Sequence, residues 1–312
     1  MTPAAVAAEL SLVARALDRA ADVVSVAGRP SSYATSHPLT ELEVAFRGGD
    51  RLELVVKELG ARALTQDALR AKACFLYDPQ RELEVYRDVL AGAELGTATL
   101  HVLVEDEGRR LLAIERVRGR PLTEVGELAT WCAVAAWLAV AHRRLAAART
   151  PRLVQWTAEL VGRWWERATL VEPDPVVASV AERSSDLAAR LLLAPIGLLH
   201  GELFASNVIV GDGGRVCPVD WELAGVGPQL FDLAALVAGR WPDADRRAIA
   251  LAYRSEMDDP PAEDAFLEQL DLCRLQVAGQ LLAANASWTP PTEHAHDWLS
   301  DVHALAPRLQ LA

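Results

Sequence analysis

Lysine is almost absent from this sequence. Of the 31 basic residues, only Lys57 and Lys72 are lysines, and the rest are arginines. Because arginine is used at almost every basic position, a lysine is present either for a specific role or by chance. Lys57 is therefore a candidate for a specific role. The basic residues are outnumbered by 43 acidic ones, which gives a formal net charge of −12. A surface of that sign repels phosphate backbones, so general nucleic-acid binding is not expected.

Long hydrophobic runs are also missing. The longest, Trp131 to Ala141, falls well short of the ~20 residues that span a bilayer. The amino-terminal residues lack the basic start and the apolar stretch of a signal peptide. The four cysteines lie far apart and show neither metal-ligand spacing nor a pairing pattern, which is typical of reduced, buried thiols. We therefore expect a soluble cytoplasmic protein with no membrane partner.

The hydrophobic pattern changes along the chain. Hydrophobic residues make up 51% of the 312 residues, which excludes a disordered chain and gives enough material for two domains. In the first 115 residues, helical spacing covers 3–20 and 79–91, and short strands fit 22–26, 42–46, 52–56, 100–105 and 110–116. The Gly48-Gly49 pair between two alternating runs is typical of a hairpin turn. This part is predicted to be a mainly antiparallel sheet with a helix against it.

The remainder is predicted to be mostly helical. Helices fit residues 127–148, 152–168, 176–193, 243–257, 262–284 and 292–306, and short strands at 196–199, 208–210 and 216–219 interrupt them. The predicted architecture is an α+β chain of two lobes. A small antiparallel β-sheet lobe covers residues 1–115, a connector covers 116–122, and a large, mainly helical lobe covers 123–312.

The most informative residues lie around the short strands of the second lobe. Glu202, Asn207 and Asp220 carry side-chain oxygens at the polar ends of these strands. Transfer of a phosphoryl group from Mg-ATP needs a carboxylate near the acceptor hydroxyl, together with an amide and a carboxylate for Mg²⁺. The five-residue step from Glu202 to Asn207 lets one loop serve both tasks, and a hairpin would return Asp220 to the same place.

These residues resemble the signature of the aminoglycoside phosphotransferase and choline kinase superfamily. The family's loop reads His-Gly-Asp, four residues, Asn, then Asp followed by Trp-Glu or Phe-Glu. The matching residues here, in order and spacing, are His200, Gly201, Asn207, Asp220, Trp221 and Glu222. The stretch Gly227–Ala234 also resembles the family's Gly-x-Pro-x-x-Asp-Leu-Ala motif. The resemblance implies a protein-kinase-like fold with ATP and Mg²⁺ between the lobes, Asn207 and Asp220 as metal ligands, and His200 and Asp232 as structural supports of the loop.

The first lobe can be compared with the same fold. Lys57 lies at the end of a predicted strand, where such a fold needs a cation for the nucleotide phosphates. The alternative is that this lysine is simply exposed at the end of the strand. Glu82, on the following helix, could hold Lys57 by an ion pair, and it is preferred over Glu84, which points to another side. A solvated helix face is the alternative for Glu82.

No Gly-x-Gly-x-x-Gly motif is present. A serine-rich loop takes its place, and Ser31, Ser32 and Ser36 could cradle phosphates, although this is also ordinary loop composition. The segment 111–122 resembles the family's connector between the lobes, in which the backbone around Glu115 and Val117 would meet the adenine edge.

One position departs from the family. Glu202 stands where the family has the catalytic aspartate, and its carboxylate has nearly the same intrinsic pKa but one more methylene. We expect an active enzyme that moves the γ-phosphoryl group of ATP to a hydroxyl of a small molecule, such as an amino sugar, an amino alcohol or an antibiotic-like metabolite. The alternatives are a non-catalytic nucleotide-binding protein, a kinase acting on Ser or Thr of a peptide, or an unrelated helical protein.

Two features bear on the acceptor. Seven acidic residues follow one another after Asp232 with no cation between them: Glu256, Asp258, Asp259, Glu263, Asp264, Glu268 and Asp271. They could form an acidic wall for a cationic acceptor, or they are solvated helix ends of an acidic protein. Trp156, Trp164 and Trp165 are more typical of core packing than of a platform for a ring.

Overall fold

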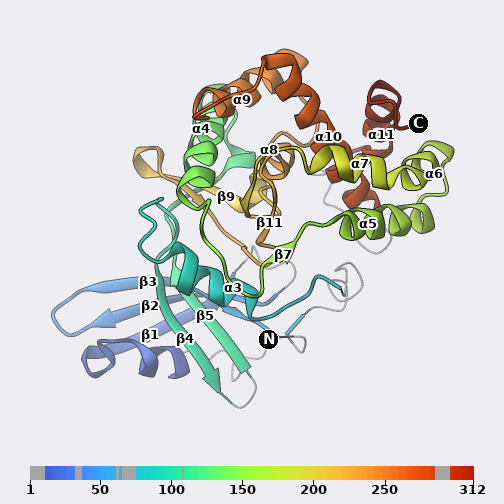
Figure 1. Ribbon diagram of the computed structural model, residues 1–312. Coiled ribbons are helices and arrows are strands. Elements are labelled where there is room, and N and C mark those ends of the chain that lie inside the picture. Colours follow the sequence, from blue (N-terminus) through green and yellow to red (C-terminus); the bar gives the residue numbers. More distant parts are fainter. Residues whose placement is uncertain (1–10, 32–36, 61–62, 65–74, 107–108, 285–295) are drawn as a thin grey trace.

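Five antiparallel strands form the smaller lobe (Figure 1). Their order across the sheet is β1-β2-β3-β5-β4. They are β1 (Val23–Pro30), β2 (Leu39–Phe46), β3 (Arg51–Glu58), β4 (Leu100–Asp106) and β5 (Arg109–Glu115). The computed structural model describes residues 11–31, 37–60, 63–64, 75–106, 109–284 and 296–312. The predicted antiparallel sheet is confirmed, although β1 extends beyond its predicted end.

The two faces of this sheet meet different neighbours because side chains alternate along each strand. On one face, Leu54 and Val56 of β3 are buried in a small core with residues of the amino-terminal segment. On the other face, Val55 packs into a core that the sheet shares with α3 and the larger lobe. Lys57 lies two residues after Val55 on the same strand. Its side chain is therefore directed toward the larger lobe.

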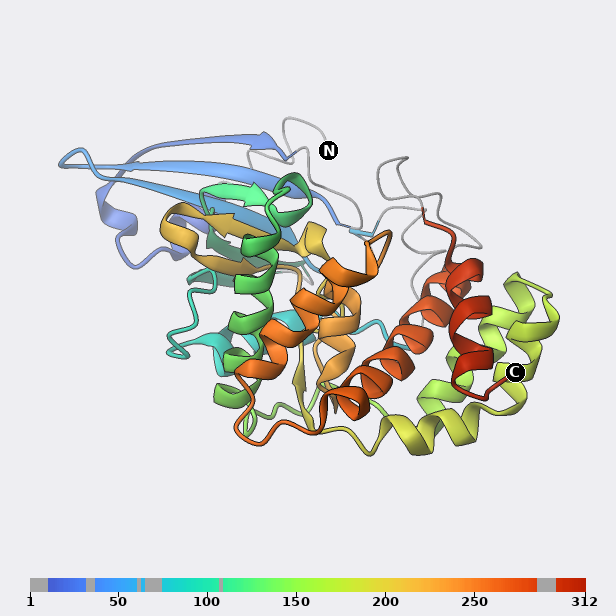
Figure 2. The same ribbon diagram turned by 90° about the horizontal axis from the view of Figure 1, so that it is seen from above.

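The larger lobe is mainly helical. The named α-helices in the described ranges are α3 (Arg81–Glu84), α4 (Leu128–Arg144), α5 (Ala158–Val171), α6 (Pro175–Glu182), α7 (Ser184–Leu191), α8 (Leu230–Leu236), α9 (Asp243–Ser255), α10 (Glu263–Ala284) and α11 (Trp298–Arg308). α4 packs against α9, and α10 packs against α5, α8 and α11, around the largest hydrophobic core. Figure 1 and Figure 2 both show α5, α6, α7 and α11 at the end of this lobe that lies away from the sheet. No helix in the described ranges is long and apolar enough to cross a membrane.

Two helices of this lobe differ from their predicted extent. The helix predicted at 176–193 is divided at Arg183, because α6 packs against α11 whereas α7 packs against α10. The helix predicted at 152–168 begins only at Ala158. The side chain of Thr157 accepts a backbone hydrogen bond from the first turn and so caps α5 at that point.

Three other predicted helices are also shorter or different. The one at 79–91 is α-helical only over α3 and continues as a π-helical segment, Val85–Leu90. In the one at 292–306, residues 292–295 lie outside the described residues, and α11 begins after the capping side chain of Asp297. Half of the helix predicted at 3–20 lies outside the described residues as well.

Two small three-stranded sheets position the loops of the larger lobe. One has the order β10-β9-β6 and the other β7-β11-β8. Their strands are β6 (Gly119–Pro121), β7 (Val154–Gln155), β8 (Ile196–Leu199), β9 (Val208–Gly211), β10 (Val216–Pro218) and β11 (Gly225–Pro228). β8, β9 and β10 lie at the predicted places. β6, β7 and β11 were not predicted, because strands of so few residues are too short to show an alternating pattern. The sheets hold the ends of the loop 200–207 and of the segment 219–224.

Candidate functional site

The loop between β8 and β9 begins at a buried carboxylate. Asp232 of α8 accepts hydrogen bonds from the backbone N–H groups of His200 and Gly201, at 2.7 and 2.9 Å. Gly201 has a φ of +90°, and a Cβ atom there would lie 2.2 Å from the carbonyl oxygen of Leu223. Only glycine fits this position. The start of the loop is therefore fixed between α8 and the segment that follows β10.

Both ring nitrogens of His200 have partners. Nε2 lies 3.0 Å from the carbonyl oxygen of Val219, which can only accept, and Nδ1 accepts a hydrogen bond from the N–H of Glu202 at 3.3 Å. These partners require the neutral tautomer with its proton on Nε2. Burial lowers the pKa of His200, which favours this form at neutral pH. The arrangement fits a support for the loop and leaves no ring nitrogen for base catalysis.

Asp232 has a further partner that sequence reasoning missed. Its Oδ2 lies 3.1 Å from Nε2 of His142 in α4, and Nδ1 of that histidine lies 2.9 Å from the hydroxyl of Tyr253 in α9. All three side chains are buried. The network connects the loop to two helices of the larger lobe. The sequence signal that could have revealed it is the histidine near the end of an otherwise apolar predicted helix.

Lys57 joins three distant parts of the chain. Its Nζ donates a hydrogen bond to Oε2 of Glu82 at 2.7 Å and a second, shorter one to Oδ1 of Asp220. Glu82 lies on α3, and Asp220 follows β10, with only Val219 between the strand and Asp220. Lys57 and Glu82 are only 9% and 2% exposed. Glu84 takes no part, because its carboxylate accepts a hydrogen bond from Arg152 at 2.8 Å.

Negative charge exceeds positive charge around this lysine. Burial acts to lower the pKa of Lys57, but the carboxylates of Asp220, Glu82 and Glu222 outweigh it and raise the pKa well above its ordinary value. Burial raises the pKa of Glu82 to about 7, although Lys57 acts against that rise. Of these carboxylates, Asp220 and Glu82 contact the Lys57 ammonium directly.

The hairpin of β9 and β10 brings Asn207 next to Asp220. The N–H of Val219 donates to the carbonyl oxygen of Asn207 at 2.9 Å, which places the two residues on neighbouring strand ends. The side-chain amide of Asn207 donates through Nδ2 to the carbonyl oxygen of Glu202 at 3.0 Å. Its Oδ1 therefore remains an acceptor. Asp220 has a φ of +67°, which non-glycine residues rarely adopt and which is frequent at functional sites.

The donor set fits Mg²⁺ shared with a phosphate. A carboxylate from Asp220 and an amide oxygen from Asn207 are hard oxygen ligands, and Mg²⁺ usually takes one or two carboxylates and completes its shell with water and substrate phosphates. Among the described residues, no cluster of three His, Cys, Asp or Glu side chains could hold a metal alone.

An arginine that the sequence analysis overlooked fixes α3. Arg81 donates through Nε to the carbonyl oxygen of Arg152 and through Nη1 to that of Glu222, both at 2.6 Å. Arg152 in turn donates to Asp78 at 3.0 Å. The helix that carries Glu82 is thus fastened to the larger lobe. Because the acceptors are backbone carbonyls, no pattern in the sequence could have pointed to them.

The serine-rich loop is only partly described. The hydroxyl of Ser31 lies 3.4 Å from a carboxylate oxygen of Glu41, and Ser32 and Ser36 lie outside the described residues. His37, which follows this loop, was not singled out. Its ring is 2% exposed, and its Nε2 lies 3.6 Å from a carboxylate oxygen of Glu222.

The predicted adenine-binding connector follows β5. The N–H of Glu115 donates to the carbonyl oxygen of Thr99 at 2.8 Å, whereas the N–H of Val117 has no acceptor among the described residues. The carboxylate of Glu115 accepts hydrogen bonds from Nη1 and Nη2 of Arg215, at 2.6 and 2.9 Å. Arg215 precedes β10, so this bidentate pair connects the sheet to the larger lobe. Its hydrogen bonds lower the pKa of Glu115 from 4.5 to about 2.

Replacing Glu115 with glutamine should lower the free energy of unfolding by about 1–2 kcal/mol at neutral pH. The full shift in pKa corresponds to about 3 kcal/mol, which the partial exposure of both side chains reduces. Because the folded-state pKa is the lower one, the contribution is present above the unfolded-state pKa and is lost as the pH falls through about 2.

Urea denaturation of the wild type and Glu115→Gln should therefore give a difference that shrinks by more than half between pH 7 and pH 3. Glu105→Gln is the matched control, because Glu105 is 64% exposed and pairs with Arg110 at the surface. A difference that stays the same at both pH values would contradict the role of the Glu115 carboxylate.

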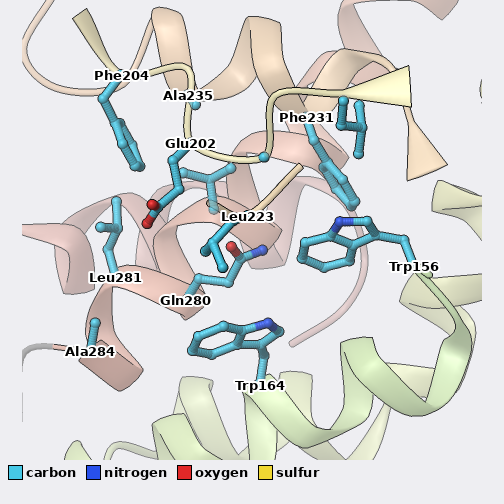
Figure 3. A pocket seen from close by; sticks show the side chains of 13 residues that line it. Trp156, Trp164, Glu202, Phe204, Leu223, Phe231, Ala235, Gln280, Leu281 and Ala284 are labelled. Carbon is cyan, nitrogen blue, oxygen red and sulfur yellow. The ribbon is translucent and has the colours of Figure 1, made fainter. Parts of the chain in front are cut away.

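A pocket opens beside Glu202 (Figure 3). Its cavity volume is about 60 Å³, and about 540 Å³ of space belongs to it when the open mouth is counted. Most of its lining is apolar: Leu199, Phe204, Leu223, Phe231, Ala235, Val277, Leu281 and Ala284. Figure 3 shows the Glu202 carboxylate on the side of Phe204 and Leu281, with the indole rings of Trp156 and Trp164 on the other side.

The three tryptophans divide between core and pocket. Trp165 is fully buried and donates to Oε1 of Gln276 at 2.9 Å, as core packing predicts. Trp156 and Trp164 line the pocket instead. A Cβ atom at Gly227 in β11 would lie 2.7 Å from Cβ of Trp156, so glycine is needed there to seat this tryptophan.

The acidic residues after Asp232 do not line the pocket as the structure describes it. They lie at the end of α9, before α10 and along its first half, whereas the pocket uses the second half of α10. Their described partners are arginines: Arg143 with Asp258 at 3.5 Å, Arg190 with Glu268 at 2.8 Å and Arg274 with Asp271 at 2.7 Å. The interpretation as a charged outer surface is therefore favoured over that of an acidic wall.

Similar solved structures share the two-lobed fold. A microcompartment-associated aminopropanol kinase is 18% identical, with a TM-score of 0.62 over 96% of this chain and 94% of that one. A choline kinase from Cryptosporidium parvum is 10% identical, with a TM-score of 0.65 over 98% and 94%. An aminoglycoside phosphotransferase from Alicyclobacillus acidocaldarius is 14% identical, with a TM-score of 0.52 over 100% and 93%. At these identities the likeness establishes the fold alone.

The sequence itself gives the family. No curated protein matches it closely enough to be counted as a relative. A family model described as the phosphotransferase enzyme family matches residues 44–266, which is more than half of the chain and includes Lys57, the loop 200–207 and Asp220. The chain belongs to the phosphotransferase enzyme family.

Proposed function

We propose that this protein transfers the γ-phosphoryl group of ATP to a hydroxyl of a small molecule. The observation that carries the proposal is the meeting of Lys57, Glu82 and Asp220, which come from three distant parts of the chain and face the β9–β10 hairpin with Asn207. A lysine held by a glutamate next to an oxygen-rich metal site is the arrangement that positions a nucleotide triphosphate.

Each of these residues has a proposed task. Residues 1–115 hold the nucleotide, residues 116–122 connect the lobes, and residues 123–312 supply the catalytic loop and the acceptor pocket. Lys57 orients the phosphates, Glu82 holds Lys57, and Asn207 and Asp220 would hold Mg²⁺, which neutralises phosphate charge when bound. The backbone near Val117 takes the adenine edge.

Glu202 has the role of catalytic carboxylate. It lines the pocket and lies five residues before Asn207, so it can reach an acceptor hydroxyl in that pocket. In the reaction the acceptor oxygen bonds to the γ-phosphorus while the bond to the β–γ bridging oxygen breaks. ADP leaves with that electron pair, and the hydroxyl proton passes to the Glu202 carboxylate.

The pocket supports a small acceptor. Its walls come from α5, α8 and α10 and from the loops around Glu202 and Leu223, so it is a local hollow beside the proposed catalytic carboxylate. A kinase for peptides would need an extended groove at this place. The similar structures act, by their titles, on aminopropanol, choline or aminoglycosides, so amino alcohols, amino sugars and antibiotic-like alcohols are the first acceptors to test.

A series of Glu202 variants tests the proposal. Mg-ATP should raise the Tm of the wild type and of Glu202→Gln alike, because the glutamate is not proposed to touch the nucleotide. With a pooled panel of alcohols, the wild type should form a phosphate monoester and Glu202→Asp should retain measurable activity. Glu202→Gln should lose at least about 10²-fold in rate, since it cannot take up the proton. Mass spectrometry of the products gives the rates.

Two results would contradict the proposal. If Mg-ATP does not raise the Tm, the nucleotide site is wrong. If Glu202→Gln keeps full activity, Glu202 is not the base. A non-catalytic nucleotide-binding protein is the second candidate, favoured by the glutamate in place of the family's aspartate, and it predicts the Tm rise with no product from any acceptor.

A further inference from the structure

Two indole N–H groups in the pocket beside Glu202 have no acceptor. Nε1 of Trp156 and Nε1 of Trp164 are shielded from solvent, and no hydrogen-bond partner for either occurs among the described residues. Trp164 is only 7% exposed. Buried donors without partners are rare in folded proteins, and each of these two calls for a partner that the described residues do not supply.

Both rings are held in place by aromatic neighbours. Trp156 packs against Phe231 with ring centroids 4.6 Å apart, and Phe75 contacts Trp164 edge-on at 5.6 Å. The donors are therefore preorganised and cannot turn easily toward other partners. Such fixed polar groups in an apolar pocket are what usually orients a bound ligand.

The pocket contains little charge. Among the described residues that line it, Glu202 is the single ionisable side chain, and Gln280 adds one amide. A cationic acceptor would lose its hydration in this pocket, and the Glu202 carboxylate alone would offset that cost in free energy. That carboxylate is already assigned to the reacting hydroxyl. A polycation is favoured still less, since the acidic residues of the stretch 256–271 do not line the pocket as described, and Asp258, Glu268 and Asp271 pair with arginines.

The unpartnered donors point in the same direction. An ammonium group brings further donors and no lone pair, so it cannot satisfy an indole N–H. A carbonyl, ether or hydroxyl oxygen can. Aromatic faces do attract cations. The N–H edge of an indole, however, carries partial positive charge and favours a ligand atom with a lone pair.

Resting on the proposed function, we infer that the acceptor is an uncharged alcohol with an apolar body and at least one oxygen that accepts from Trp156 or Trp164. The reacting hydroxyl faces Glu202, and the apolar body fills the space between Phe204, Leu281 and the two indole rings (Figure 3).

Two matched pairs of probes test the charge. Choline and 3,3-dimethylbutan-1-ol have the same shape and differ by the positive charge, and phenylalaninol and N-acetylphenylalaninol differ by a charged amine against a neutral amide with a carbonyl oxygen. Calorimetric titration and turnover with Mg-ATP should both favour the neutral member, with N-acetylphenylalaninol bound at least about tenfold more tightly than phenylalaninol. Tighter binding of the charged member in both pairs, or no binding of either neutral probe at millimolar concentration, would overturn the inference.

Trp164→Phe tests the N–H itself, because it keeps an aromatic ring and removes the donor. The Kd of N-acetylphenylalaninol should rise about three- to tenfold, the loss expected for one hydrogen bond, whereas the Kd of 3,3-dimethylbutan-1-ol should change less than about twofold. Trp165→Phe is the control on the same helix, since its N–H already binds Gln276, and it should change neither Kd. Equal changes for both probes in Trp164→Phe would mean packing alone and would overturn the assignment.

These outcomes separate the inference from the proposed function. If Mg-ATP raises the Tm and choline is phosphorylated in preference to its neutral isostere, the phosphotransferase stands and the neutral acceptor fails. If Mg-ATP neither binds nor yields product with any probe, the proposed function fails whatever the pocket binds.

Discussion

Replacing Asp220 with asparagine or alanine should reduce turnover by at least about 10³-fold. Asp220 combines two tasks in the proposed site, because it bonds Lys57 and supplies the carboxylate for Mg²⁺. Asparagine is the sharper variant, since it tolerates the φ of +67° and changes little but the charge. Lys57 keeps its contact with Glu82 at 2.7 Å, so neither variant leaves a buried ammonium alone.

The rate of product formation at saturating Mg-ATP is the measurement, with the Tm recorded to show that the variants are folded. Asp212→Ala is the matched control, because Asp212 lies in the exposed turn between β9 and β10 of the same hairpin. It should keep wild-type activity. Full activity of Asp220→Asn would refute the metal assignment and with it the central part of the proposed site.

Replacing Asp232 with alanine should have the largest effect on stability. The carboxylate accepts from the N–H groups of His200 and Gly201 and bonds His142, all within the buried core of the larger lobe. Alanine leaves these groups without a partner, and we expect a loss of about 3–5 kcal/mol in the free energy of unfolding. Activity should fall by about 10²-fold as well, because the loop that carries Glu202 loses its fixed start.

Urea denaturation and turnover at a temperature where the variant is folded give the two values. Asp232→Asn keeps one acceptor oxygen and should recover part of both losses. Asp243→Ala, which removes a fully exposed carboxylate in α9, should change stability by less than about 0.5 kcal/mol. If Asp232→Ala unfolds at the urea concentration of the wild type, the carboxylate does not hold the loop.

Much of the fold could be predicted because its elements are long and periodic. Before Gly48-Gly49, β2 alternates regularly in burial, β3 after it does so over most of its length, and α10 lies within one residue of its predicted start. The predictions were wrong where tertiary contacts decide the local structure. The division of 176–193 at Arg183 follows from two different partner helices, and β6, β7 and β11 exist because neighbouring strands pair with them.

The candidate site shows the same contrast. Lys57, Glu82, Asn207 and Asp220 could be proposed because their types and spacing carry chemistry, and the structure brings them together. The supports of this site could not be proposed. Arg81 donates hydrogen bonds to backbone carbonyls, and Tyr253 is connected to the loop through His142. Neither contact can be recognised from residue types or their spacing.

The scarcity of lysine has a practical consequence. One of the two lysines in the sequence lies at the centre of the proposed nucleotide site, where it is buried and bonds Glu82 and Asp220, and every other basic residue except Lys72 is an arginine. Amine-directed acylating reagents, including those built on nucleotides, therefore find very few targets in this chain. The extent to which Lys57 is shielded from such a reagent becomes a direct readout of whether its cleft is filled.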